Sequence, residues 1–139
     1  MKKIVCCDFD GVIHSYMTGW KGPRVISDLP NEGAIKWIEE FIMLHCTPPD
    51  SIAAMSAEGD FEFCIYSSRS KSFGGRRAMK NWLVKHGLDP RFLEVIKFPS
   101  KKPAAFVTID DRVIRFDAVF PTFEEVISFK PTRKLNTGV

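Results

Sequence analysis

The sequence has no apolar run of the roughly 20 residues needed to cross a bilayer, so it predicts no membrane-spanning helix. Its four cysteines form no C-x-x-C pair, which argues against a clustered zinc site. No G-x-x-x-x-G-K-S/T segment is present, and this leaves a P-loop nucleotidase without support. The net charge of +3 is too small to indicate nucleic-acid binding by itself.

The first residues also lack the pattern of a secretory signal. The apolar segment Ile4–Cys7 meets Asp8 before it reaches the length of a signal-peptide core. We therefore expect a cytoplasmic protein with reduced thiols. In that setting the four cysteines are small core residues: Cys6, Cys7, Cys46 and Cys64.

What is present is typical of one globular domain: 139 residues, 45% of them apolar and 27% charged. We expect the domain to cover residues 1–129 and the polar, basic segment 130–139 to be a flexible tail. Short apolar runs predict strands over 4–7, 61–66, part of 92–98, and 104–109. Apolar residues at helical spacing predict helices over 31–44, with Asn31 as the expected cap, over 75–86, and over 122–129, which opens with the capping box Thr122-Phe-Glu-Glu125. We also expect an irregular flap over 15–30 and a hairpin over 113–120.

Strands that alternate with helices predict an α/β fold with a central parallel sheet. We expect a three-layer α/β/α, Rossmann-like arrangement with helices on both faces of the sheet. Sites in such sheets lie beyond the carboxyl ends of the strands. Asp8, Ser67 and Asp110 each follow a predicted strand, so this fold would bring them to one rim.

Two acidic segments stand at predicted strand ends, Asp-Phe-Asp-Gly at 8–11 and Asp-Asp at 110–111. Carboxylates so close to a core are costly unless cations or hydrogen bonds compensate them. Carboxylates are also the protein ligands that Mg²⁺ favours. The expected magnesium ligands are Asp8, the backbone carbonyl of Asp10, and Asp110, while Asp111 either binds through water or orients Lys102.

Hydroxyl and ammonium groups are expected beside these acids. Ser67 follows a strand and can donate to a phosphoryl oxygen, and Ser68 competes for that role. Lys102 precedes the last predicted strand, where an ammonium group would offset negative charge, and Lys101 competes with it. Arg69 either meets substrate or pairs with an acid.

The ordered set of D-x-D-G, a strand-end serine, Lys-Pro and D-D resembles the haloacid dehalogenase superfamily of phosphohydrolases. The likeness runs from Ile4 to about Phe129 and is greatest to small phosphatase-like members often encoded by phages and prophages. It rests on three segments: Asp8-Phe-Asp-Gly-Val-Ile-His-Ser15, Ile65-Tyr-Ser-Ser-Arg-Ser70 and Ile109-Asp-Asp-Arg112.

The resemblance implies a magnesium-dependent phosphatase. Asp8 would form a transient aspartyl phosphate, and Asp10 would protonate the leaving group and then take a proton from water. Ser67 would hold the phosphoryl group, Lys102 would balance its charge, and Asp110 would carry Mg²⁺.

Gly11, Ser68 and Arg69 are the expected substrate-binding residues. The flap is too short for the lid domain usual in this superfamily, so we expect no separate cap domain. An open site suits a bulky phosphate monoester, such as a nucleotide, a nucleic-acid end or a phosphoprotein. The alternative is a binding or regulatory module that keeps the fold with weak or no catalysis, and the sequence leaves the oligomeric state open.

Overall fold

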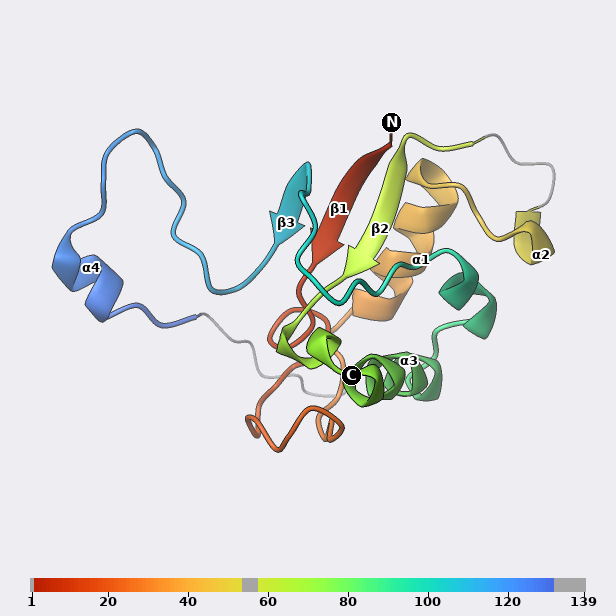
Figure 1. The fold of residues 1–139 in the computed structure, drawn as a ribbon, viewed down its shortest axis with the longest axis horizontal. Helices are drawn as coiled ribbons and strands as arrows, with labels where there is room; N and C mark the ends of the chain where they lie inside the picture. The colour runs from red at the N-terminus through yellow and green to blue at the C-terminus, as the bar shows by residue number, and fades with distance from the viewer. Residues whose placement is uncertain (1, 54–57, 132–139) are drawn as a thin grey trace.

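The computed structural model describes residues 2–53 and 58–131. At its centre is a three-stranded parallel sheet in the order β2-β1-β3 (Figure 1). The strands are β1 (Lys3–Cys7), β2 (Phe61–Ile65) and β3 (Val107–Ile109). The α/β class and the parallel sheet are therefore confirmed.

Two long helices alternate with the strands, since α1 (Ala34–His45) joins β1 to β2 and α3 (Phe73–Lys85) follows β2. The core combines side chains of β1 and β2 with side chains of both helices: Val5, Cys7, Phe63, Ile65, Ile38, Ile42, Met79 and Leu83. The strand residues in this core alternate along the chain, so both helices cover the same face of the sheet. The short elements are α2 (Asp50–Ala53), η1 (Ser68–Lys71), η2 (Pro90–Glu94) and α4 (Phe123–Ile127).

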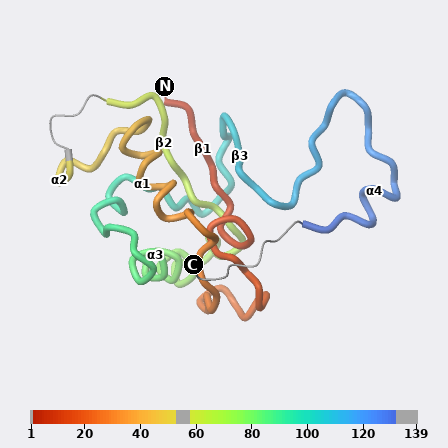
Figure 2. The backbone as a smooth tube through the Cα atoms, turned by 180° about the vertical axis from the view of Figure 1, so that it is seen from behind, coloured from red at the N-terminus to blue at the C-terminus, as the bar shows by residue number. Residues whose placement is uncertain are grey.

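The segment after β3 leaves the body of the molecule. We call residues 112–129 the C-terminal arm. Figures 1 and 2 show α4 at the far end of this arm, away from the sheet, and α4 has no buried residue. The described helices therefore do not form the second layer of the expected three-layer arrangement. The arm also contains no strand, so the predicted hairpin over 113–120 is wrong.

The segment 92–98, predicted to contain a short strand, begins within η2 and forms no strand. Pro90 favours the first turn of a helix, and the Asp89 side chain caps it. Only Lys97 pairs with β2, through two backbone hydrogen bonds of 2.9 and 3.0 Å. The last predicted strand is confirmed but shortened to β3.

The first residue of α1 differs from the prediction. Asn31 was expected to cap this helix, but Gly33 occupies the cap position with a left-handed backbone. The Asn31 side-chain amide instead donates to the Val12 carbonyl at 2.8 Å. The Asn31 side chain therefore forms a long-range contact instead of the helix cap that local sequence preference predicts.

The other helix caps follow local chemistry. Ser72 caps α3, which begins at Phe73 rather than at the predicted Gly75. Thr122 and Glu125 form the predicted capping box of α4. No helix in the described residues is long and apolar enough to span a membrane. Positions 132–139 of the predicted tail lie outside the described part of the chain.

Candidate functional site

The carboxyl ends of the strands surround a small pocket of ≈ 150 Å³. Its lining includes five residues that the sequence predicted for the functional site: Asp8, Ser67, Ser68, Lys102 and Asp110. They come from the ends of all three strands and from the segment before β3. The structure therefore brings groups that are far apart in the sequence to one rim of the sheet.

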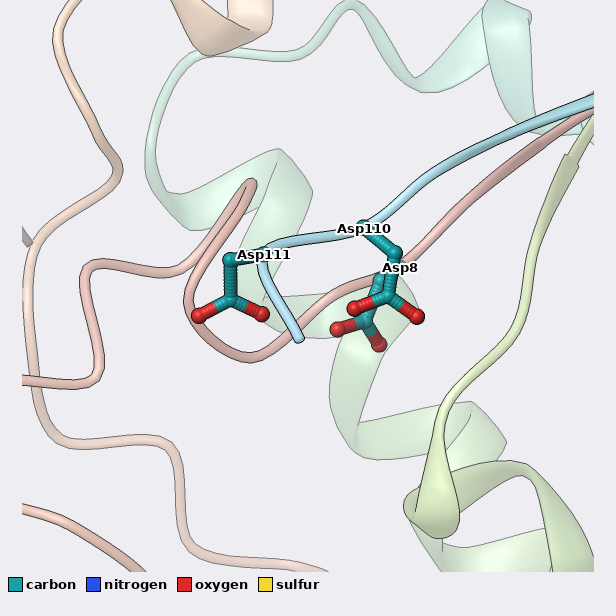
Figure 3. A group of neighbouring side chains, drawn as sticks. All are labelled: Asp8, Asp110 and Asp111. Atoms are coloured by element: carbon teal, nitrogen blue, oxygen red, sulfur yellow. The ribbon is translucent and has the colours of Figure 1, made fainter. Parts of the chain in front are cut away.

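Asp8, Asp110 and Asp111 form a cluster at this rim (Figure 3). One carboxylate oxygen from each lies within 4.8 Å of the corresponding oxygens of the other two, and all three residues are partly buried. One backbone hydrogen bond joins the start of the loop after β1 to the end of β3, and a second, local hydrogen bond positions the Asp8 side chain. The N–H of Asp8 donates to the Ile109 carbonyl at 2.9 Å, and the N–H of Phe9 donates to Asp8 Oδ1 at 2.9 Å.

Burial and neighbouring acids change the electrostatics of Asp8. Burial, followed by the negative charge of Asp110, raises the pKa of Asp8 from 3.8 to about 7. Asp111 and Asp10 act in the same direction, while the hydrogen bond from the next backbone N–H opposes the shift. Three carboxylates at this separation are disfavoured as anions unless a cation is present, and a divalent ion with oxygen ligands suits them.

Gly11 allows Asp111 to lie against the loop after β1. The φ of Gly11 is +89°, and a Cβ at this position would overlap the Asp111 carboxylate. Both the backbone conformation and the lack of space thus favour glycine. Gly11 was expected to bind substrate, but the contact seen here is with Asp111, so the residue shapes the acidic cluster.

The carboxylate of Asp10 has different neighbours. It accepts hydrogen bonds from Arg69 Nε at 3.0 and 3.1 Å, and one of its oxygens lies 2.9 Å from His14 Nδ1. The Asp28 N–H donates to His14 Nε2 at 3.1 Å, so Nδ1 carries the ring proton and donates it to Asp10. Among the described residues the metal-competent cluster contains Asp8 but not the Asp10 side chain.

Arg69 is fully buried, with 0% of its surface exposed. Its Nη1 donates to the carbonyls of Gly22, Pro23 and Val25 in the flap, each at 3.0 Å. Its guanidinium also lies 4.8 Å from the centre of the Trp20 ring. Arg69 was expected to meet substrate or to pair with an acid. The contacts correspond to the second expectation, and they join the flap to the Asp10 loop.

The geometry separates the competing candidates. Lys102 lines the pocket around Asp8, whereas Lys101 does not. Ser67 Oγ is buried and accepts a hydrogen bond from the Arg69 N–H at 3.1 Å, because Ser67 caps η1. Ser68 is exposed at the same pocket, so its hydroxyl is the more accessible of the two.

The sequence did not predict that Asp10 contacts both His14 and Arg69. The only local signal was the four-residue spacing of Asp10 and His14, and these residues lie in a turn rather than on a helix. The partner on the other side, Arg69, comes from a distant segment. No pattern in either segment encodes the pairing, so only the folded chain reveals it.

These features define an α/β protein whose parallel sheet carries clustered carboxylates, a lysine and two serines beyond the carboxyl ends of its strands. Comparisons with models of protein families, with curated proteins and with solved structures found no match.

Proposed function

We propose that this protein is a magnesium-dependent phosphohydrolase that forms a covalent phosphoryl intermediate on Asp8. The observation that carries the proposal is the single pocket lined by Asp8, Asp110, Lys102 and two serines. Phosphoryl transfer depends mainly on positioned charges and hydrogen-bond donors. This pocket combines a nucleophilic carboxylate, a cation and hydroxyl donors.

The acidic cluster fits Mg²⁺ because it supplies three convergent carboxylate oxygens and lets Asp111 approach over Gly11. Asp8, Asp110 and Asp111 would hold the ion, with the backbone carbonyl of Asp10 as the further ligand expected from the sequence. When bound, the ion supplies positive charge that neutralises and orients the phosphoryl oxygens.

In the proposed reaction, a carboxylate oxygen of Asp8 bonds to phosphorus while the ester P–O bond breaks and the leaving oxygen takes up a proton. Water then attacks the phosphorus of the aspartyl phosphate, which releases inorganic phosphate and regenerates the carboxylate. Lys102 balances the negative charge of the phosphoryl group. Ser68, or Ser67 after a change of hydrogen-bond partner, donates to a phosphoryl oxygen.

Asp10 is the proposed acid–base residue: its protonated carboxyl gives the proton to the leaving oxygen in the first step, and the resulting carboxylate takes a proton from the attacking water in the second. Its carboxylate is bound by Arg69 and His14, so it must exchange an Arg69 hydrogen bond for one to the leaving group. Proton transfer is thereby coupled to the loop that Arg69 holds. Arg69 itself is a positioning residue in this proposal.

We also propose that the fold is a small, capless haloacid dehalogenase-like variant of the Rossmann-like class. Acids after β1 and β3 and serines after β2 support this assignment. The flap is too short to contain a lid domain, so we propose an open site that accepts a bulky phosphate monoester. We also propose that the protein acts in the cytoplasm.

The test is a screen of phosphate monoesters with Mg²⁺ and with a chelator. We expect hydrolysis only with the metal, and an acid-stable mass increase of one phosphoryl group on Asp8 in quenched reactions. Asp8→Asn should lose both signals, whereas Asp60→Asn, an exposed acid away from the pocket, should keep them. Normal turnover by Asp8→Asn would overturn the proposal.

A binding or regulatory module without catalysis is the second candidate, and the pairing of Asp10 with Arg69 is the observation that favours it. This candidate predicts calorimetric Mg²⁺ binding that Asp110→Ala weakens, with no phosphoprotein in quenched mixtures for any substrate. Trapping of the aspartyl phosphate would exclude it.

A further inference from the structure

A second concavity, of ≈ 700 Å³, lies between the flap and α3. Its walls carry three exposed cationic side chains, Arg24 from the flap and Arg77 and Lys85 from α3. No described acidic residue lines this groove. Within residues 2–53 and 58–131, none of the three cations forms an ion pair with an acid. The positive charge of the groove is therefore available to an anionic ligand.

One wall is a regular stripe on α3. Phe73, Arg77, Asn81 and Lys85 recur every four residues, so they lie along one side of the helix. Burial of Met79 fixes the opposite side against the core. Phe73 lies on the same side of the helix as Arg77 and Lys85, and 70% of its surface is exposed. Charged and amide side chains are exposed because water solvates them. An apolar ring gains no such solvation, so the exposure of the aromatic side chain in this stripe needs another explanation.

The other wall is held in place by the flap. Arg24 packs on α3 at Gly74, where an added Cβ would overlap the Arg24 Nε. Arg69 donates to the backbone carbonyls on both sides of Arg24 and also binds Asp10. The groove wall is thus tied through one buried side chain to the loop of the Asp8 pocket.

We propose that this groove binds single-stranded nucleic acid and directs its phosphorylated end to the Asp8 pocket; the second part of this statement rests on the proposed phosphohydrolase function. Cations that contact phosphates, combined with an aromatic side chain that stacks on bases, are the usual components of single-strand binding sites. Here Arg24, Arg77 and Lys85 contact phosphates, and Phe73 stacks on a base.

The dimensions and connections agree with this ligand. From Phe73 to Lys85 the helix rises about 18 Å at 1.5 Å per residue. That length accommodates several phosphates of a stacked strand, which are spaced by roughly 3.4 Å. The chain also runs directly from Ser68 at the Asp8 pocket through η1 into Phe73 at the groove.

Binding is tested apart from catalysis with the Asp8→Asn protein in chelator. The probe is a fluorescent oligothymidylate of about 12 nucleotides with a terminal phosphate, a length within the usual site size. We expect fluorescence anisotropy to report binding that weakens as salt increases. Arg77→Glu in this background should weaken binding roughly tenfold or more and lower the salt slope by about one.

The matched control is Lys36→Glu, which makes the same charge change on the exposed face of α1. We expect it to retain the affinity of the Asp8→Asn parent. Equal weakening by Arg77→Glu and Lys36→Glu would show an effect of net charge and overturn the groove assignment. Failure of the parent protein to bind at low salt would do the same.

A second variant distinguishes a nucleic-acid strand from other anions. Phe73→Ala should weaken oligonucleotide binding about fivefold or more through loss of stacking. It should leave competition by inorganic tripolyphosphate unchanged, because that anion has no base. Because Phe73 is exposed, this variant is expected to fold. If Phe73→Ala weakens neither ligand, or both equally, the groove is not a site for stacked bases.

The outcome for the groove is separable from the outcome for the proposed function. Hydrolysis of p-nitrophenyl phosphate by the wild-type protein without oligonucleotide binding would remove the groove proposal and keep the phosphohydrolase. Binding that depends on Arg77 and Phe73, without hydrolysis of any phosphate ester, would keep the groove and remove the enzyme.

Discussion

Two neighbouring aspartates have opposite surroundings in this protein. Asp8 lies among other carboxylates, whereas Asp10 lies between a guanidinium and an imidazole N–H. The sequence marks both as acids at the end of a strand. It does not mark which of them receives a cationic partner, since Arg69 is distant along the chain. Residue identity therefore predicted the acidic cluster, while the division of roles depends on tertiary contacts.

The raised pKa of Asp8 predicts a pH-dependent stability in the metal-free protein. The folded state binds the Asp8 proton more tightly than the unfolded chain does, so the stability contributed by this proton is fully present below pH 3.8 and is lost as pH rises through about 7. In chelator, we expect Asp8→Asn to gain stability over the wild type within this window, by at most about 1.4 kcal/mol per pH unit.

Denaturant titrations of both proteins across this pH range measure the difference. It should reach a plateau above about pH 7, and saturating Mg²⁺ should shrink it because the cation offsets the same charge. A difference that is constant with pH would contradict the raised pKa.

Gly11 and Gly19 form a matched pair for testing the shape of the acidic cluster. Both have a positive φ, but a Cβ at Gly19 meets nothing within 4 Å, whereas one at Gly11 meets Asp111. Each alanine variant should lose roughly 1–2 kcal/mol of stability to the backbone conformation. Only Gly11→Ala should also weaken Mg²⁺ binding, by about tenfold, or roughly 1.4 kcal/mol. Calorimetric titration gives both affinities, and equal values would show that Asp111 does not contribute to the site.

At the scale of elements, the sequence predicted the segments whose apolar residues recur at a regular spacing. It did not predict the segments whose conformation depends on contacts with distant residues. The apolar spacing in α1 and α3 and the short apolar runs of β1 and β2 are local signals, and they correspond to observed elements. The pairing of Lys97 with β2 involves a single residue, so no strand pattern in the sequence predicts it. The flap has no periodicity at all, and its position depends on Arg69.

Arg69 is predicted to be the main anchor of the flap. Arg69→Met removes the donor to three flap carbonyls and one of the two donors to the Asp10 carboxylate, which keeps its hydrogen bond from His14. Loss of one partner of a buried pair typically costs about 3–5 kcal/mol. The control is Arg91→Met, which removes an exposed pair with Asp89 and should lower the free energy of unfolding far less than Arg69→Met does. Denaturant titration measures both losses.

Flap anchoring has a second readout that survives a large loss of stability. Arg69→Lys keeps a cation beside Asp10 but cannot donate to all three flap carbonyls. Trypsin should therefore cleave the folded variant faster after Lys21 or Arg24, which lie in the flap. Cleavage at the wild-type rate would show that the flap is held by other contacts.

At the scale of the whole molecule, the sequence predicted the parallel sheet and the shared rim because polar residues mark where each buried strand ends. It did not predict that the helices of the core share one face. An amphipathic pattern shows that a helix has an apolar side, but it does not specify the surface against which that side packs. The capping box of α4 was therefore recognisable, while the position of α4 was not.

The C-terminal arm exposes an unusual amount of apolar surface for a segment that follows directly on the site. Eight large side chains of the arm are exposed: Val113, Ile114, Phe116, Val119, Phe120, Phe123, Val126 and Ile127. Phe123 reaches 87% exposure on α4, which has no buried residue. Exposed apolar side chains bind hydrophobic dyes, so the arm should dominate the dye binding of the native protein.

Ending the chain after Arg112 removes all of the arm except its first residue and keeps β3, Asp110 and Asp111. Because the arm contributes nothing to the buried core, we expect the midpoint of thermal unfolding to change by less than about 3 °C, which corresponds to less than about 1 kcal/mol. Dye fluorescence should fall strongly in the same protein, and Phe120→Ser in the full chain should lower it in part without affecting the midpoint. A large drop in the midpoint for both variants would mean that the arm packs against the sheet in solution and completes the missing helical layer.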